Sequence, residues 1–221
     1  MIKSPLSMTI SRYFILLFVS FLFAGNFQAY AQSGNSLLFR EDFKEIPATI
    51  PVTQEHNQNN ELKLHLYGEA KNQLKKSNHP EIPNDPYYIW SGTCEGNWAM
   101  ALSWLDKPID LSKGGKIRWR SRQSGFRQLR VLLELPDGSW IVSEDHVGET
   151  KDWEISEFEV GEMKWRKLNM ENIIEGHPVG APDISKVLKI GISDLMVGGG
   201  TPASSRLDWI EVYGKEKQQY Q

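Results

Sequence analysis

The sequence predicts an all-β protein, a two-sheet antiparallel jelly-roll sandwich. Apolar and polar residues alternate with period two in several separate segments, a pattern typical of half-buried strands. Turn sequences such as Pro136-Asp137-Gly138 stand between these segments. No segment of useful length has the 3.6-residue apolar period of an amphipathic helix. Many short strands with turns between them indicate a sandwich or barrel.

The alternation places each expected strand along the chain. The expected strands cover residues 36–43, 61–68, 87–91, 97–105, 116–123, 129–135, 140–142, 152–160, 186–195 and 206–213. Residues 116–142 predict three antiparallel strands joined by tight turns within one sheet. Residues 69–86 are polar and contain three prolines, and residues 161–183 lack periodicity. We therefore expect a long exposed loop and an irregular segment there.

The first 31 residues have the features of a cleaved signal peptide. Lys3 and Arg12 precede an uncharged apolar run, and Ala29-Tyr30-Ala31 is a small-residue cleavage site. This predicts a single jelly-roll domain over residues 32–214, a polar tail over 215–221, and a secreted or periplasmic protein. No membrane span is expected in the mature chain, because the apolar run belongs to the leader; an uncleaved anchor is the alternative.

Charge and cysteine content narrow the functional classes. The formal net charge is −3, and loss of Lys3 and Arg12 with the signal peptide makes it −5. A net negative chain disfavours a general nucleic-acid partner. Cys94 is the single cysteine, so an intramolecular disulfide is excluded and the domain must be stabilised by its core.

The arginine-rich strand is the sharpest candidate site. Arg118, Arg120 and Arg122 point to one side of a strand, and guanidinium groups pair bidentately with carboxylate or sulfate. This predicts a groove for an anionic glycan. The alternative is pairing with the acidic residues of 141–162 across the sheet, which needs no ligand.

Aromatic side chains form a second candidate. Tyr88 and Trp90 lie in a short aromatic strand and could stack under sugar rings as ligand-binding residues. Aromatic residues on alternating strands are more often part of the core, which is the alternative here. No motif for a catalytic dyad, phosphate loop or histidine metal site is present, so no catalytic residue is assigned.

Several landmarks follow one another in a characteristic order. They are Leu38-Phe39-Arg40-Glu41-Asp42-Phe43, Asp110-Leu111-Ser112, the Pro136-Asp137-Gly138 turn before Trp140, Trp153-Glu154-Ile155, Asp183-Ile184-Ser185-Lys186-Val187, and Leu207-Asp208-Trp209-Ile210-Glu211-Val212-Tyr213. This order resembles secreted bacterial β-jelly-roll domains of the galactose-binding-like, carbohydrate-binding-module type. The resemblance covers most of the expected mature chain, and residues 69–86 depart from it.

The resemblance implies a function and one possible metal site. It implies a non-catalytic module that binds a polysaccharide or other glycan, and the arginines favour an acidic polysaccharide. It also implies that acids on the first and last strands, Glu41, Asp42 and Asp208, could hold a structural calcium, since carboxylate oxygens suit Ca²⁺; no other cofactor is expected. The alternatives are a jelly-roll polysaccharide lyase or glycosidase, with Arg120, Arg122, Tyr88 and His146 as lyase candidates, and a structural envelope domain that binds protein.

Overall fold

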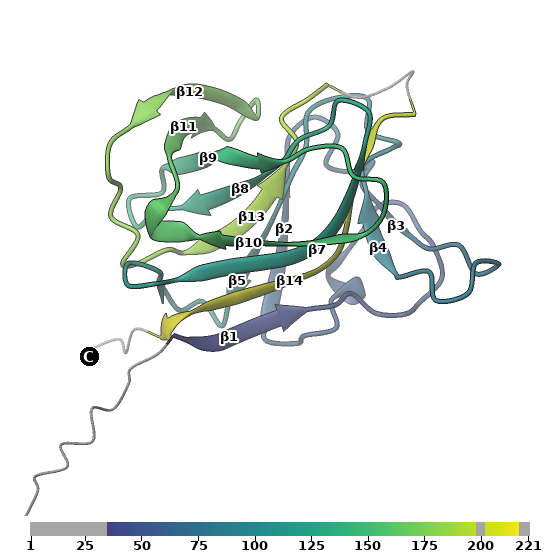
Figure 1. The fold of residues 1–221 in the computed structure, drawn as a ribbon, viewed down its shortest axis with the longest axis horizontal. Helices are drawn as coiled ribbons and strands as arrows, with labels where there is room; N and C mark the ends of the chain where they lie inside the picture. The colour runs from purple at the N-terminus through teal and green to yellow at the C-terminus, as the bar shows by residue number, and fades with distance from the viewer. Residues whose placement is uncertain (1–34, 198–201, 217–221) are drawn as a thin grey trace, which may run out of the picture. The chain divides into compact units, whose positions relative to one another are not determined.

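The chain forms two antiparallel sheets packed as a sandwich (Figure 1). A computed structural model describes residues 35–197 and 202–216. The expected signal peptide and the end of the expected tail lie outside the described residues. Within them, the helical elements are two single-turn 3₁₀ helices, η1 (Gln54–His56) and η2 (Val160–Glu162). The predicted all-β fold class is confirmed.

Seven strands form each sheet. Sheet A contains β10 (Glu154–Glu159), β7 (Lys116–Ser124), β14 (Ser204–Glu216), β4 (Tyr88–Trp90) and β3 (Lys75–Ser77), with β1 (Ser36–Glu41) and β6 (Ile109–Asp110) also paired to β14. Sheet B contains β12 (Ile174–Val179), β11 (Trp165–Asn169), β9 (Trp140–Val147), β8 (Leu129–Glu134), β13 (Lys189–Ser193), β5 (Ala99–Trp104) and β2 (Leu62–Tyr67), in that order. The first strand, β1, pairs with the last, β14, and Arg40 lies opposite Glu211.

The expected three-stranded unit over residues 116–142 is wrong, because it is divided between the sheets. β7 belongs to sheet A, whereas β8 and β9 belong to sheet B. The chain leaves β7 at Gly125, whose φ of +66° is a conformation that favours glycine. Arg127 is then buried and pairs with Asp194. A buried ion pair thus holds the crossing that the turn residues alone did not reveal.

Three segment predictions also need correction. Residues 69–86 contain β3, with Leu74 and Lys76 fully buried, and residues 161–183 contain β11 and β12. β12 lies at the edge of sheet B and most of its side chains are exposed, so it has no alternation to detect. β14 continues through Lys215 and Glu216, which were expected in the tail.

The main core lies between the two sheets. Leu129, Val131 and Leu133 are fully buried there, as is Trp119 of β7. Ile210 of β14 is buried in the same core, whereas Trp209, 8% exposed, lies on the outer side of sheet A beneath Arg40. The alternation on β7 and β8 therefore identifies their inward sides correctly.

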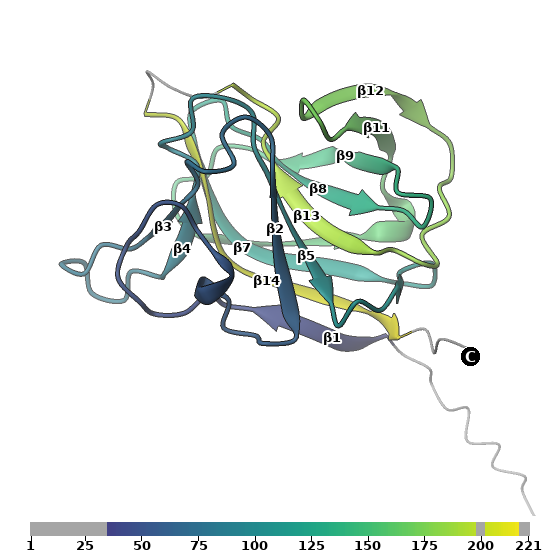
Figure 2. The ribbon, with the colours of Figure 1, turned by 180° about the vertical axis from the view of Figure 1, so that it is seen from behind.

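A second apolar cluster lies on the other side of sheet B. Ala101, Leu132 and Val142 are fully buried even though the residues flanking them face the main core. Trp140 and Ile173 complete the cover. Strands β11 and β12 continue sheet B beyond β9 and curve over at that edge (Figures 1 and 2). The outer face of sheet B is thus largely closed by its own side chains.

Candidate functional site

A β-bulge in β14 shapes the outer face of sheet A. Leu207 pairs with Ser121 and Trp209 pairs with Arg120, so Asp208 is an extra residue between them. The bulge brings both Asp208 and Trp209 beside Arg120. The Arg120 Nη1 donates to Asp208 Oδ2 at 2.7 Å. Burial raises the pKa of the Asp208 carboxyl, and the contact with Arg120 opposes that shift.

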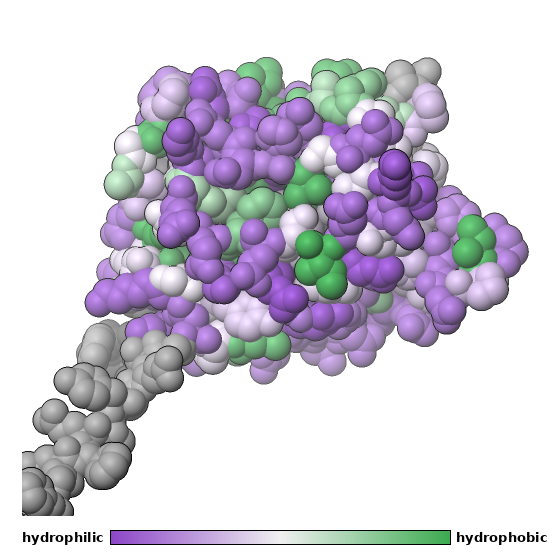
Figure 3. Space-filling model, in the orientation of Figure 1, coloured by the Kyte–Doolittle hydropathy of each residue, from purple (hydrophilic) through white to green (hydrophobic). Residues whose placement is uncertain are grey.

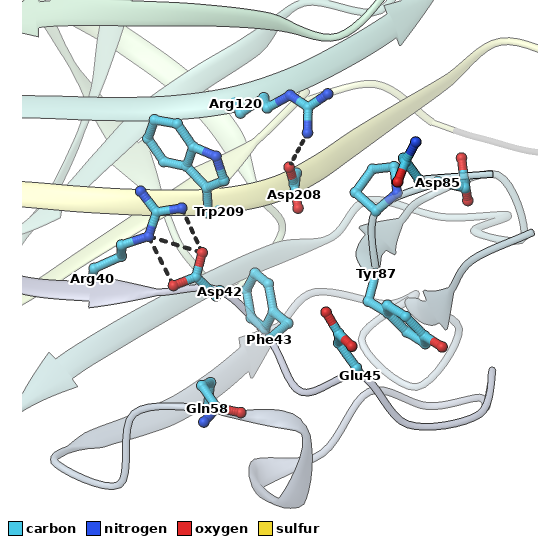
Figure 4. Close-up of a pocket in the computed structure, with 12 residues that line it drawn as sticks. Arg40, Asp42, Phe43, Glu45, Gln58, Asp85, Tyr87, Arg120, Asp208 and Trp209 are labelled. Carbon is cyan, nitrogen blue, oxygen red and sulfur yellow. Dashed lines mark hydrogen bonds and ion pairs between the residues drawn. The ribbon is translucent and has the colours of Figure 1, made fainter.

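An open cleft of about 700 Å³ lies at this bulge (Figure 4). Its side chains come from β1 and the loop after it, the loop before β4, β7 and β14. They are Arg40, Asp42, Phe43, Glu45, Gln58, Asn84, Asp85, Pro86, Tyr87, Arg120, Asp208 and Trp209. The volume is typical of a small-molecule or oligosaccharide site.

Guanidinium and carboxylate groups neutralise each other along one wall of the cleft. Arg40 Nε lies 2.8 Å from each carboxylate oxygen of Asp42, and Arg40 Nη1 lies 2.6 Å from Glu211. The same guanidinium lies over the Trp209 ring, 4.2 Å from its centroid. Arg40 thus holds the indole in place beneath a charged, hydrogen-bonding surface.

The opposite wall is aromatic and acidic. Figure 4 shows Tyr87 between Glu45 and Asp85. The Tyr87 ring has the Lys76 ammonium 4.6 Å from its centroid, and that ammonium is buried with no hydrogen-bond partner among the described residues. Glu45 is exposed, and Asp85 Oδ2 accepts from the backbone N–H of His79 at 2.7 Å. Carboxylates and a tyrosine edge are groups that bind hydroxyl-rich ligands.

The predicted ligand-binding arginines have three different environments. Arg118 is paired with Glu157 at 3.2 Å and Glu211 at 3.1 Å, so the alternative of cross-sheet pairing holds for it. Arg120 lines the cleft. Arg122 lies directly opposite Arg206 of β14 and makes no ion pair within the described residues. Of these three arginines of β7, Arg118 is paired with acids and Arg120 lines the cleft. Arg122 has no acidic partner among the described residues.

The predicted aromatic pair is also divided. Tyr88 is 1% exposed, and its ring lies 5.2 Å from that of Trp153. Tyr88 is therefore packed, as the core alternative expected. Trp90 is half-buried on the outer face and has the Lys75 ammonium 5.4 Å from its ring centroid. The Trp153 ring centroid also lies 5.5 Å from the Arg120 guanidinium carbon. Trp153 therefore lies between Tyr88 and an arginine that lines the cleft.

The acids predicted as calcium ligands are each bound by groups of the protein itself. The Glu41 carboxylate is buried and accepts backbone N–H groups of Phe43 and Gln58, both at 2.7 Å. Asp42 and Asp208 are bound by Arg40 and Arg120. Residues 35–197 and 202–216 contain no group of three acidic, histidine or cysteine side chains placed to hold a metal. Glu41 instead fixes the loop that follows β1.

The residues named for a lyase do not converge. Arg120, Arg122 and Tyr88 belong to sheet A, whereas His146 is in β9 of sheet B, opposite Arg130. Cys94 is buried, and that burial raises the pKa of its thiol to about 12. Neither His146 nor Cys94 is therefore placed to act on a ligand in the cleft.

Sequence reasoning missed most of the cleft. Arg40 and Trp209 were not ligand-binding candidates, because they belong to segments distant in sequence from Arg120 that meet it only after folding. The one local signal was Leu207-Asp208-Trp209, in which strict alternation would place Asp208 on the opposite side from Trp209. The bulge cancels that alternation.

The comparisons with known proteins bear on the general fold. No family model and no curated protein sequence matches the chain. Similar solved structures include a family 11 carbohydrate-binding module of a Clostridium thermocellum cellulosomal cellulase, with 14% identity over 85% of this chain and 98% of that one and a TM-score of 0.42. The Clostridium thermocellum family 11 module in complex with a β-1,3-1,4-mixed-linked tetrasaccharide has 14% identity, coverages of 77% and 98%, and a TM-score of 0.44. A family 29 module variant complexed with cellulohexaose has 12% identity, coverages of 76% and 94%, and a TM-score of 0.43. At these values the likeness assigns no ligand, and the sandwich is established by the strand pairing of the chain itself.

Proposed function

We propose that this chain is a non-catalytic glycan-binding module whose ligand occupies the cleft beside the Asp208 bulge. The observation that carries the proposal is the composition of the cleft. The half-buried Tyr87 provides aromatic surface beside Trp209, which is 8% exposed beneath the Arg40 guanidinium, and Arg120, Asp208 and Glu45 provide hydrogen-bonding groups around it. Sugar rings present apolar C–H faces and a rim of hydroxyls, and they match such a mixture of surfaces.

The non-catalytic assignment is supported by the state of the carboxylates. Glycoside hydrolysis needs one carboxyl group as acid and another as base or nucleophile. In the cleft, the Asp42 and Asp208 carboxylates are each bound by an arginine guanidinium. Their geometry suits fixed hydrogen-bond acceptors for hydroxyl groups. A lyase or glycosidase is the competing function, and protein binding within the cell envelope is a third.

The charge of the glycan is a separate part of the proposal. The sequence favoured an acidic polysaccharide because of Arg118, Arg120 and Arg122. Arg118 and Arg120 are already paired with acids, so an acidic ligand would depend on cations outside those pairs. The surface on this side is mostly hydrophilic, with only isolated hydrophobic residues (Figure 3). Such a surface suits a hydrated glycan chain.

Calorimetric titration tests the proposed function. The purified protein is titrated with a panel of neutral, uronate and sulfated oligosaccharides, alongside Tyr87→Ala and the control Tyr213→Ala. Tyr213 is a half-buried tyrosine of sheet A that lies outside the cleft. We expect Tyr87→Ala to weaken binding at least about tenfold and the control to leave it nearly unchanged. Absence of binding to every glycan contradicts the proposal, and reducing ends released from a bound glycan contradict the non-catalytic part.

Secretion is supported only by the features of residues 1–31. Expressed in a Gram-negative host, the exported protein should begin at Gln32. Intact-mass measurement of the exported fraction checks this. A mass that still includes Met1 contradicts the cleavage.

In the residues described, no helix is both apolar and long enough to cross a membrane.

A further inference from the structure

Among the residues that the structure describes, one row of side chains on the outer face of sheet A has no acidic partner. The strand pairing places Arg122 opposite Arg206, Arg206 opposite Trp90, and Trp90 opposite Lys75. We name these four residues the cation row. It crosses β7, β14, β4 and β3 in one line. Within the described residues, its three cations make no ion pair with any carboxylate.

The rest of the same strand makes this row unusual. Lys116 lies 2.8 Å from both Glu157 and Glu159, Arg118 is paired with two acids, and Arg120 is paired with Asp208. Every outward cation of β7 before Arg122 is therefore matched. Arg122 instead has another arginine directly across the strand pair, an arrangement that is destabilising in the absence of a counter-charge.

The surroundings of the row suit a bound anion. Arg206 donates a hydrogen bond to the hydroxyl of Tyr88. The Trp90 indole packs against Gly92, where a Cβ would come within 2.1 Å of the ring, so only glycine fits at that position. The half-buried indole, with Lys75 beside it, gives an apolar surface flanked by cations on both sides. Planar guanidinium groups hold sulfate or carboxylate oxygens through paired N–H donors.

The row lies next to the proposed glycan cleft. Arg120 lines the cleft, and Arg122 is two residues further along the same face of β7, a rise of about 7 Å. That separation is comparable to the length of one to two sugar units. Trp153, partly exposed near Arg120, lies on the same side of the sheet.

We infer that the cation row binds an anionic substituent, a sulfate ester or a uronate carboxylate, on the glycan held in the cleft. This inference rests on the proposed function and adds its substrate class. Arg122 and Arg206 would clamp the anion between two strands, and Lys75 with Trp90 would contact the same or the next sugar unit. The repulsion between the two arginines is relieved when the anion binds.

The test compares each glycan with its uncharged counterpart. A sulfated oligosaccharide is titrated beside its desulfated form, and an oligogalacturonate beside its methyl ester. The proteins are wild type, Arg122→Gln/Arg206→Gln, and the control Lys116→Gln/Arg118→Gln, which removes the same charge from the matched end of the face. Arg122→Lys/Arg206→Lys keeps the charge but removes the planar donors. Thermal melting confirms that each variant is folded.

We expect wild type to bind one charged form about tenfold more tightly than its uncharged counterpart. Arg122→Gln/Arg206→Gln should abolish that preference while it keeps the affinity for the uncharged form. The lysine variant should keep only part of the preference, and the control should keep most of it. Equal loss in the glutamine variant and the control would reduce the effect to general electrostatics and overturn the inference.

The remaining outcomes separate this inference from the proposed function. If uncharged glycans bind and their charged forms bind no better, the inference fails and the glycan-binding function stands. If no glycan of either kind binds, both fail. If the charged form binds better but the preference survives in Arg122→Gln/Arg206→Gln, the anion is bound elsewhere and the inference fails.

Discussion

The outer faces of the two sheets are built in opposite ways. On sheet B, Leu132 and Val142 are fully buried, and Trp140 and Ile173 pack over them. On sheet A, charged side chains stand on the outer face, and an open cleft lies beside the β14 bulge. Sheet B thus has an outer face covered by apolar side chains, whereas sheet A presents charged groups around an open cleft. The candidate site is therefore on sheet A.

Truncation of a buried side chain should show the largest difference between the faces. Leu132→Ala should lower the free energy of unfolding by about 2–5 kcal/mol, because it leaves a cavity in the closed face. Ile155→Ala, at a position on β10 that is 58% exposed, should change it by at most about 0.5 kcal/mol. Denaturant unfolding measures both. Similar losses from the two substitutions would show that the outer face of sheet B is not closed.

Two neighbouring lysines extend the comparison to the inside of sheet A. Lys75 is on the outer face, whereas Lys76 is fully buried, and burial lowers the pKa of its ammonium to about 8. Lys76→Met should therefore stabilise the protein at pH 7, by a gain on the order of 3 kcal/mol. Lys75→Met is the matched control and should have little effect on stability.

The pH dependence of stability has a definite sign for Lys76. Its pKa is about 8 when folded against an ordinary value of 10.5, so the unfolded chain binds the extra proton between those pH values. The contribution of Lys76 should make the wild type more stable as pH rises from about 8 to 10.5, and Lys76→Met should lose that rise. Urea titrations across this range measure it. Parallel curves for the two proteins would contradict the buried, unpaired ammonium.

At the end of sheet A where the cations are paired with acids, two arginines share one carboxylate, that of Glu211. Glu211 is 7% exposed and accepts from Arg40 at 2.6 Å, Arg118 at 3.1 Å and the Tyr213 hydroxyl at 2.9 Å. Glu211→Gln should cost about 1–3 kcal/mol in the free energy of unfolding, since two guanidinium groups each lose one of their two acidic partners. Glu159→Gln, at a half-exposed pair with Lys116, should cost at most about 1 kcal/mol. A loss for Glu159→Gln as large as that for Glu211→Gln would contradict this account.

At the end of sheet A where Arg122 lies opposite Arg206, removal of a charge should raise the free energy of unfolding. Arg122→Gln removes a like charge from opposite Arg206, so it should stabilise the protein by about 0.2–1 kcal/mol at low salt. The gain should shrink as salt is added, because exposed charges are screened. Arg118→Gln, at the matched end, is the control and should destabilise instead. A loss of stability for Arg122→Gln would mean that the arginine already has a partner.

The sequence was sufficient to predict features that depend on a single strand, such as which of its side chains face the core. The alternation over β7 separates Trp119, which is buried, from Arg118 and Arg120, which face outward. The alternation does not predict that Arg122 lies opposite Arg206, because the register between β7 and β14 is fixed only when these distant strands meet. The position of Asp208 beside Arg120 could not be predicted for a related reason. A bulge breaks the alternation of a strand without a characteristic residue pattern.

Indole NMR can show whether the outer face of sheet A is the glycan-binding face. The eight tryptophans include Trp90, Trp153 and Trp209 on the outer side of sheet A and Trp140 in the closed cluster of sheet B. Their indole N–H signals, assigned by single substitutions, are followed during titration with the tightest-binding oligosaccharide from the panel. The account predicts shifts at Trp153 and Trp209, joined by Trp90 when the glycan is anionic, with Trp140 unmoved. Shifts at Trp140 that leave the other three unchanged would place the ligand on sheet B and contradict the account.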